Sequence, residues 1–352
     1  MIVGAGLGAA VASWLLVALL IRLAPVIGLV DRPNQRSLHK KVMPRGGGLG
    51  FVLVVTLVLG VLMMSEAGGA IPRGAMLVYL GAALAIAGVS LRDDFVSLGA
   101  GLRFLCQLAV AGAAVGGVGY FRDLLLPGGI SLHLGGWGAV LTIVWIVGLT
   151  NAYNFMDGID GIAGAQGLIA GGAWALTGAW LGVPTIALLG ALLAGGCLGF
   201  LRHNWSPARI FMGDVGSAFL GYSFGVLPLF LLRPVPTPSR PLDAGMVPML
   251  ALLLLWPFIG DGLYTFVRRA RRREAVWKPH RSHLYQRLVQ AGWTHSQVSS
   301  LYAGWCLLSA LAGWCWLNDV GRLVVPAGQL SSLAALVYFV RGREKPTGPD
   351  HD

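Results

Sequence analysis

Residues 135–164 read GGWGAVLTIVWIVGLTNAYNFMDGIDGIAG, and this stretch decides what kind of protein the chain is. An apolar run ends in asparagines and in two carboxylates, Asp157 and Asp160, each followed by glycine. A carboxylate at membrane depth is costly unless it is paired, hydrated or bound to a metal, so it indicates a functional site. The alternative is an acidic turn that caps the next helix, because Asp and Gly are ordinary turn residues.

The whole chain has the composition of a polytopic membrane protein. Of its 352 residues, 56% are hydrophobic and 12% are charged, and the mean hydropathy is +0.71. We predict an all-α helical bundle that forms one membrane-embedded domain, residues 1–352, with about 10–11 transmembrane helices. The expected spans are 3–23, 48–64, 74–92, 101–120, 135–151, 163–180, 184–201, 215–232, 246–267, 298–317 and 321–340. No basic residue precedes Arg22, so the first span is predicted to be a retained helix and not a cleaved signal.

The basic residues predict how the chain is oriented. Most of its 26 lysines and arginines fall in loops on one side of the predicted membrane. The positive-inside rule makes that side cytoplasmic, with the N-terminus periplasmic and the C-terminus cytoplasmic in a bacterial inner membrane. The net charge of +11 is therefore explained by orientation and anionic lipid, and no nucleic acid partner is expected. The polar loops on this side are about 31–47, 92–101, 151–163, 202–214 and 268–297.

Five acidic residues fall on the cytoplasmic side: Asp93, Asp94, Asp157, Asp160 and Asp214. Adjacent carboxylates such as Asp93 and Asp94 repel each other and need a cation or a proton between them. Oxygen ligands of this kind suit Mg²⁺, with Mn²⁺ as the alternative, because both bind through a few carboxylates and substrate phosphates. For Asp214, which precedes the eighth span, a helix cap is the competing interpretation.

Basic residues and histidines on the same side suit phosphate oxygens. Arg45 is followed by three glycines, which let the backbone approach an anionic ligand. The last polar loop carries His280, Arg281 and His283 among many arginines, a pattern typical of an anion or metal site. Asp261, near the inner end of the ninth span, is interpreted equally well as a structural partner of a nearby arginine or as a functional residue.

Together these residues favour metal-assisted phosphoryl transfer. A site at the inner membrane interface meets a soluble nucleotide from the cytosol and a lipid phosphate from the bilayer. Positioning and charge neutralisation supply most of the catalysis in such reactions. The chain has no GxxxxGK[ST] loop, so nothing indicates ATP hydrolysis.

Several motifs resemble one family, the polyprenyl-phosphate N-acetylhexosamine-1-phosphate transferases. The matching pieces are DRPNQRSLH with PRGGG, the Asp93-Asp94 pair, NAYNFMDGIDG, NWSPARIFMGDVGS and the late histidine loop, in the family's order over nearly the whole chain. The resemblance implies transfer of sugar-1-phosphate from a UDP-N-acetylhexosamine to undecaprenyl phosphate, with release of UMP and with Mg²⁺. It also implies a multi-pass membrane enzyme that contacts membrane lipid, and it makes a homodimer one expected assembly.

The resemblance also implies roles for single residues. Asp214 matches the metal-binding aspartate, and Asp93 and Asp94 match an acidic pair assigned to lipid-phosphate activation or metal handling. Phe211 matches an aromatic that stacks on uracil, and His283 matches the first histidine of the late cluster. The nucleotide-site and catalytic polar positions are matched by Asp157, Asp160, Asn154 and Asn204, and the expected substrate contacts also include Arg45, His280 and Arg281.

The chain departs from its relatives in the late loop, where HRSHLYQRL places Tyr285 and Gln286 at the later histidine positions. Ser97 stands where the peptidoglycan enzyme has a lysine. These departures argue against a MurNAc-pentapeptide donor and favour the subgroup that starts O-antigen or other surface glycans, with donors such as UDP-FucNAc or UDP-QuiNAc. A secondary transporter or a lipid phosphatase is the alternative function.

Overall fold

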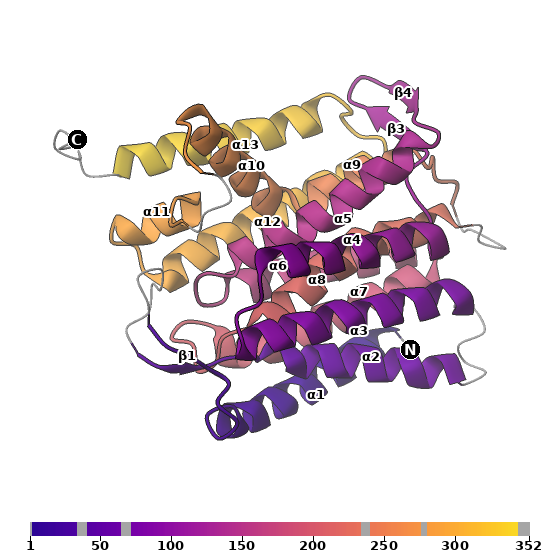
Figure 1. Cartoon of the computed structure of the whole chain (residues 1–352). Coiled ribbons are helices and arrows are strands. Elements are labelled where there is room, and N and C mark those ends of the chain that lie inside the picture. Colours follow the sequence, from indigo (N-terminus) through magenta and orange to yellow (C-terminus); the bar gives the residue numbers. More distant parts are fainter. Residues whose placement is uncertain (1, 34–40, 65–71, 234–239, 276–279, 344–352) are drawn as a thin grey trace.

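A computed structural model of the chain describes residues 2–33, 41–64, 72–233, 240–275 and 280–343. Thirteen α-helices, one 3-10 helix and two small hairpins make up the described residues. Most of the long helices run roughly parallel to one another (Figure 1). The helices are α1 Ile2–Leu23, α2 Gly48–Met64, α3 Arg73–Phe95, α4 Ala100–Gly117, α5 Trp137–Met156, α6 Ile162–Leu181, α7 Pro184–Asn204, α8 Asp214–Val226, η2 Leu227–Leu232, α9 Met246–Leu254, α10 Trp256–Arg271, α11 Leu284–Gln290, α12 His295–Leu317 and α13 Val324–Arg343.

The all-α prediction is confirmed, and each of the eleven expected spans is helical. Helices satisfy their own backbone polar groups, which lipid cannot do. Among the described residues, eight helices are long and apolar enough to cross a membrane, or nine if the bent pair α9 and α10 counts as one span. The helix α2, with 17 residues, is shorter, and α6 is not among the eight, although it has 20 residues.

The ninth predicted span, 246–267, is not one straight helix. It divides into α9 and α10, which meet at Leu255 with a bend of 82°. Pro257 lies in the first turn of α10. Proline lacks an N–H, and its ring clashes with the carbonyl four residues earlier, so the α9 helix cannot continue through this position.

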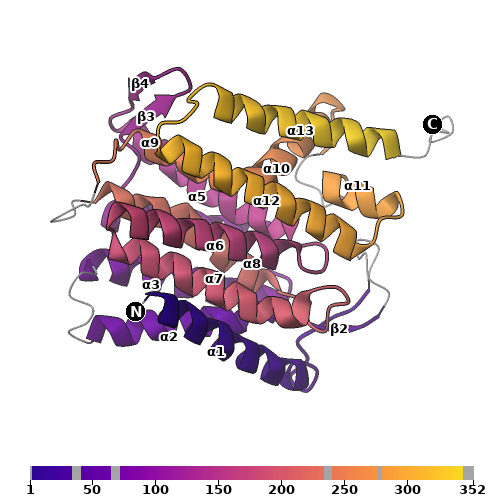
Figure 2. The same ribbon diagram turned by 180° about the vertical axis from the view of Figure 1, so that it is seen from behind.

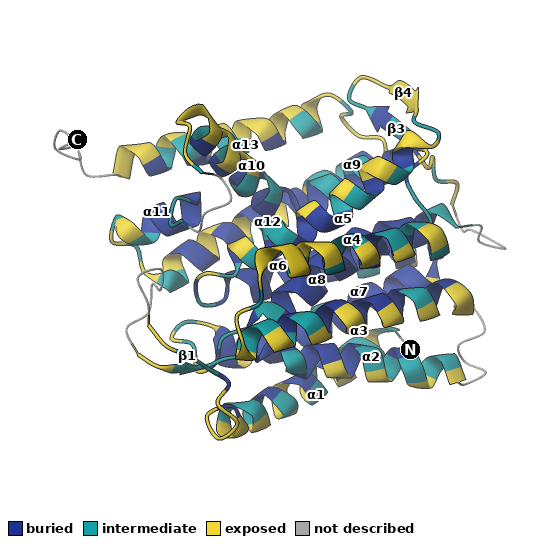
Figure 3. Ribbon diagram, in the orientation of Figure 1, coloured by how far each residue is buried: buried dark blue, intermediate teal, exposed yellow. Residues whose placement is uncertain are grey.

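The core lies around α7 and α8, which Figure 3 shows as buried between the outer helices. Seen from behind in Figure 2, α1 lies along α7. Gly195 and Gly199 face α1 so closely that an added Cβ would collide with the carbonyls of Gly6 and Ala10. Small residues of this kind let membrane helices pack backbone to backbone.

The loops predicted to carry the site gather at one end of the bundle. The hairpin of β1 Val30–Asp31 and β2 Met43–Pro44 lies there, and the hairpin of β3 Asp123–Leu126 and β4 Ile130–His133 lies at the opposite end (Figure 1). Residues 34–40 of the first loop and 276–279 of the last are outside the described residues. Because β3 and β4 lie far from the acidic cluster, their residues take no part in it.

Candidate active site

The two neighbouring acids at the end of α3 have different surroundings. The carboxylate of Asp94 is fully buried and accepts the N–H groups of Asp214, at 2.9 Å, and Val215, at 3.1 Å. These are the first two residues of α8, so Asp94 caps α8 from another helix. The predicted alternative for Asp214, that it caps α8 itself, is wrong, because Asp214 is already inside the helix and Gly213 precedes it.

Gly213 makes this capping arrangement possible. Its φ is +79°, and an added Cβ would lie 2.8 Å from an oxygen of Asp94. Gly216 packs against Gly48 of α2, and a Cβ added to Gly216 would lie 2.7 Å from the Cα of Gly48. In MGDVGS, Gly213 therefore makes room for Asp94 and Gly216 makes room for α2. These neighbours fill the space beside the two glycines, so a phosphate does not fit there.

Arg45 joins the acids of two helices. Its Nε lies 2.8 Å from Asp94 Oδ1, and its Nη2 lies 2.7 Å from Asp214 Oδ1. The loop that carries Arg45 is fixed by main-chain hydrogen bonds from Gly47 to the Phe211 carbonyl and from Gly48 to the Met212 carbonyl. Arg45, which the sequence predicts to contact substrate, is thus already paired with two carboxylates in this structure.

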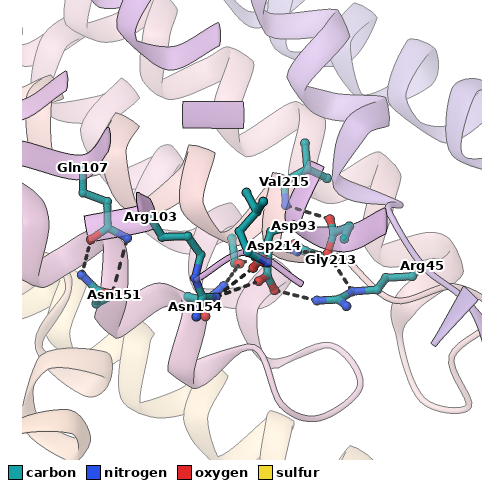
Figure 4. Close-up of polar contacts among 12 residues, drawn as sticks. Arg45, Asp93, Arg103, Gln107, Asn151, Asn154, Gly213, Asp214 and Val215 are labelled. Carbon is teal, nitrogen blue, oxygen red and sulfur yellow. Dashed lines mark hydrogen bonds and ion pairs between the residues drawn. The ribbon is translucent and has the colours of Figure 1, made fainter. Parts of the chain in front are cut away.

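A second arginine, Arg103 of α4, approaches the cluster from the other side, as Figure 4 shows. Its Nη1 lies 2.8 Å from Asp93 Oδ2 and 3.7 Å from Asp214 Oδ2. Asp93 also accepts the N–H of Leu98 at 2.6 Å, and Asn154 donates to Ser217 at 3.1 Å beside this group. The carboxylates of Asp93 and Asp214 therefore share Arg103, while Asp214 also pairs with Arg45.

The carboxylates of Asp93 and Asp214 fit the ligand chemistry of Mg²⁺. Within the described ranges, no three or more His, Cys, Asp or Glu side chains form a metal-binding group. Mg²⁺ does not need one, because it binds through one or two carboxylates and completes its shell with water and substrate phosphate. Asp93 and Asp214 converge from α3 and α8 on Arg103, so an incoming phosphate and a cation can replace that contact.

Asp157 and Asp160 follow α5 and are held differently. Burial, with the nearby charge of Asp214, raises the pKa of Asp157 to about 8. Burial also acts to raise the pKa of Asp160, but hydrogen bonds from His295 and from the Ala208 N–H outweigh it and lower that pKa. The Asp160 carboxylate accepts the Ala208 N–H at 3.1 Å and lies 3.3 Å from His295 Nδ1, so it ties three loops together.

Asn204 and Phe211 lie in the wall that supports the acids. Asn204 is buried, accepts the Gly161 N–H at 2.9 Å and donates to the Ile210 carbonyl at 3.0 Å. The main chain of Phe211 bonds to Pro44 and Gly47. Neither side chain lines the cavity described below. Their predicted substrate contacts remain predictions.

A cavity of about 560 Å³ opens beside the acids. It brings together four of the predicted residues, Asn154, Asp214, His280 and His283, whereas Arg281 is not among the residues that line it. Burial, and then the positive charges of His283 and Arg269, lower the pKa of His280 to about 4. The lining residues are Ile86, Val89, Ser90, Ala100, Gly101, Arg103, Phe104, Gln107, Asn151, Asn154, Phe155, Asp214, His280, His283 and Gln286.

Sequence comparisons show which family the chain belongs to. The profile of glycosyl transferase family 4 matches residues 76–232. A probable undecaprenyl-phosphate N-acetylglucosaminyl 1-phosphate transferase of Bacillus subtilis is 36% identical over 278 residues, which cover 78% of this chain and 73% of that protein. The chain belongs to glycosyl transferase family 4.

Two further relatives of the family cover more of the chain at lower identity. A decaprenyl-phosphate N-acetylglucosaminephosphotransferase of Mycobacterium tuberculosis is 29% identical and covers 99% of this chain and 91% of its own length. An undecaprenyl-phosphate alpha-N-acetylglucosaminyl 1-phosphate transferase of Escherichia coli is 27% identical and covers 91% of this chain and 84% of its own length. The family resemblance predicted from the motifs is confirmed.

Three features of this glycosyl transferase family 4 site were missed or left undecided by the sequence. Arg103 is one basic residue among many, and nothing in its local pattern sets it apart. Gln107 and Asn151 form a paired amide contact in the cavity, with Asn151 Nδ2 2.6 Å from Gln107 Oε1. Asp261, which the sequence left undecided between a structural and a functional role, bonds to His283 and Tyr302.

Proposed function

We propose that this chain transfers N-acetylhexosamine-1-phosphate from a UDP-sugar to undecaprenyl phosphate and releases UMP. One observation carries the proposal. The lining of the cavity includes the polar residues Asp214, Arg103 and Asn154 and the apolar residues Ile86, Val89 and Phe104. The polar lining residues suit the two phosphates, and the apolar ones suit a prenyl chain. The names of the family relatives support the same pairing of substrates.

The reaction exchanges one pyrophosphate bond for another. An oxygen of the lipid phosphate attacks the phosphorus next to the sugar, and the bond from that phosphorus to UMP breaks. The second pKa of a phosphate monoester is about 6, so the lipid phosphate is largely a dianion at neutral pH and needs no strong base. Asp93 and Asp214 would hold Mg²⁺, which would neutralise charge on the transferring phosphoryl group.

The protein's own residues would supply position and charge. Arg103 lines the cavity and its side chain is 40% exposed, so it can leave Asp93 and contact phosphate. Arg45 and Asp94 are bonded to each other and hold the start of α8, which fixes Asp214. The N-terminus is proposed to be periplasmic, and the site is proposed to face the cytoplasm of a bacterial inner membrane, because the basic loops lie at this end.

The donor sugar and pathway are part of the proposal. Tyr285 and Gln286 at the later histidine positions support an N-acetylhexosamine donor of the surface-glycan type, such as UDP-FucNAc or UDP-QuiNAc. Purified protein should be incubated with undecaprenyl phosphate, Mg²⁺ and a panel of UDP-sugars. We expect UMP and lipid pyrophosphoryl-sugar in equal amounts, identified by mass spectrometry.

Asp214→Asn is the matched control for this experiment. Release of inorganic phosphate from the lipid without any UDP-sugar would show a phosphatase and overturn the proposal. Association into a homodimer stays a prediction, which analytical ultracentrifugation in detergent would check.

A further inference from the structure

A buried carboxylate outside the metal cluster lies directly behind His283. Asp261, near the start of α10, has a side chain with no exposed surface. Its two oxygens receive contacts from five donors. They are Thr265 Oγ1 at 3.1 Å, His283 Nδ1 at 3.1 Å, Leu284 N at 3.0 Å, Tyr285 N at 3.3 Å and Tyr302 Oη at 2.5 Å.

This arrangement fixes which nitrogen of His283 faces the carboxylate. With so many donors directed at it, Asp261 acts only as an acceptor, so Nδ1 of His283 must carry the proton that lies between them. The other ring nitrogen, Nε2, is buried and has no hydrogen-bond partner within the described part of the chain. His283 lines the cavity together with Asp214 and Asn154. The ring that carries this unpartnered nitrogen therefore lines the cavity proposed to take the substrate.

The loop that carries His283 is fastened on both sides of the ring. Tyr285 Oη donates to the Phe155 carbonyl at 3.0 Å, which joins α11 to the end of α5. The main-chain N–H of His283 donates to Gln286 Oε1 at 3.2 Å. The ring of His280 stacks on that of His283 with centroids 5.0 Å apart. The two residues that replace later histidines, Tyr285 and Gln286, thus help to hold the remaining one.

We propose that Asp261 is a positioning residue for the transfer reaction. It holds His283 with Nε2 toward the phosphates of the nucleotide donor, which rests on the function proposed above. Nε2 can then donate a hydrogen bond to a phosphate oxygen when it is protonated, with the negative charge of Asp261 behind the ring. The rival interpretation is that Asp261 only ties α10 to α11 and α12.

A double-mutant cycle separates the two interpretations. Asp261→Asn and His283→Ala should each lower kcat about 100-fold, because a displaced contact at the reacting groups costs that much. The double variant should be no slower than His283→Ala alone, since Asp261 acts through that ring. Tyr302→Phe, which removes a hydrogen bond from the same carboxylate but leaves the ring contact, should stay close to wild type. Losses that multiply in the double variant would overturn the proposal.

Ring nitrogen NMR tests the positioning without any turnover. Full-length protein labelled with ¹⁵N-histidine and reconstituted in lipid should show a protonated Nδ1 for His283, assigned by comparison with His283→Gln. Asp261→Asn should shift this signal, and Tyr302→Phe should not. An unprotonated Nδ1 in the wild-type protein would overturn the proposal. Absence of sugar-phosphate transfer by the wild type would instead count against the proposed function.

Discussion

Loss of charge should cost the protein much more stability at Asp94 than at Asp214. Asp94 accepts hydrogen bonds from two main-chain N–H groups of α8 and pairs with Arg45. The side chain of Asp94 has no exposed surface. Asparagine offers a single acceptor oxygen, so in Asp94→Asn one N–H of α8 faces an amide NH₂ group. Loss of a charge-assisted hydrogen bond costs about 1.5–3 kcal/mol. The weakened pair with the partly exposed Arg45 adds about 1 kcal/mol at most.

Asp214→Asn should cost much less stability. The Asp214 side chain is 22% exposed, and its neighbours include Asp93 and Asp157 as well as Arg45. Removal of its charge loses an ion pair but also relieves repulsion, so the change in unfolding free energy should be about 1 kcal/mol or less. Turnover should fall about 100-fold or more, because stabilisation of charge by a metal is worth several kcal/mol.

The assay pairs thermal unfolding in detergent with Mg²⁺-dependent UMP release. We expect Asp94→Asn to lower the Tm by several degrees and Asp214→Asn to leave it nearly unchanged. Asp94→Asn with unchanged Tm would refute its role as the cap of α8. A folded Asp214→Asn protein with normal turnover and normal Mg²⁺ dependence would refute the metal assignment.

The remaining predictions concern charge, protons and orientation. Arg103→Gln should raise the KM for the UDP-sugar about tenfold, because one charged phosphate contact is lost; steady-state kinetics checks this, and an unchanged KM would contradict it. The pKa of Asp157 is raised from 3.8 to about 8, so between these values the folded protein keeps a proton that the unfolded chain releases, and stability should fall as pH rises. Asp157→Asn should flatten this slope in Tm measured without Mg²⁺ from about pH 5 to 8. Cysteines at Ser206 and Ser282 should be labelled only from the cytoplasm, and labelling from the periplasm of intact cells would reverse the orientation.

Much of the fold could be predicted because apolar runs of about twenty residues have few other structures available in lipid. The bend at Pro257 was not predicted. Its residues are as apolar as those of a continuous span, and hydropathy does not report a change of helix direction. The gathering of the five loops at one end could also be predicted. Successive loops between membrane spans lie on alternate sides of the membrane, so the side of each loop depends only on the number of spans before it.

The sequence could predict which residues form the candidate site, but not which contacts each of them makes. Asp93 and Asp94 are identical and adjacent, yet successive residues of a helix point about 100° apart. One therefore reaches α8 and the other reaches Arg103. Asp261 was undecided because its partner His283 lies 22 residues later in the sequence, beyond the end of α10. Such a contact depends on the tertiary structure, and a local pattern does not contain it.

The bend between α9 and α10 gives a physical reason to expect that turnover depends on the state of the bilayer. Beyond the bend, Leu263, Phe266 and Val267 of α10 are exposed, and arginines follow them. A helix of this kind settles at the depth set by membrane thickness and lateral pressure. The same helix carries Asp261, which holds His283. We therefore expect turnover in nanodiscs to change with lipid chain length even when acceptor and donor are saturating, because the lipid would then act on the position of α10 and not on substrate binding.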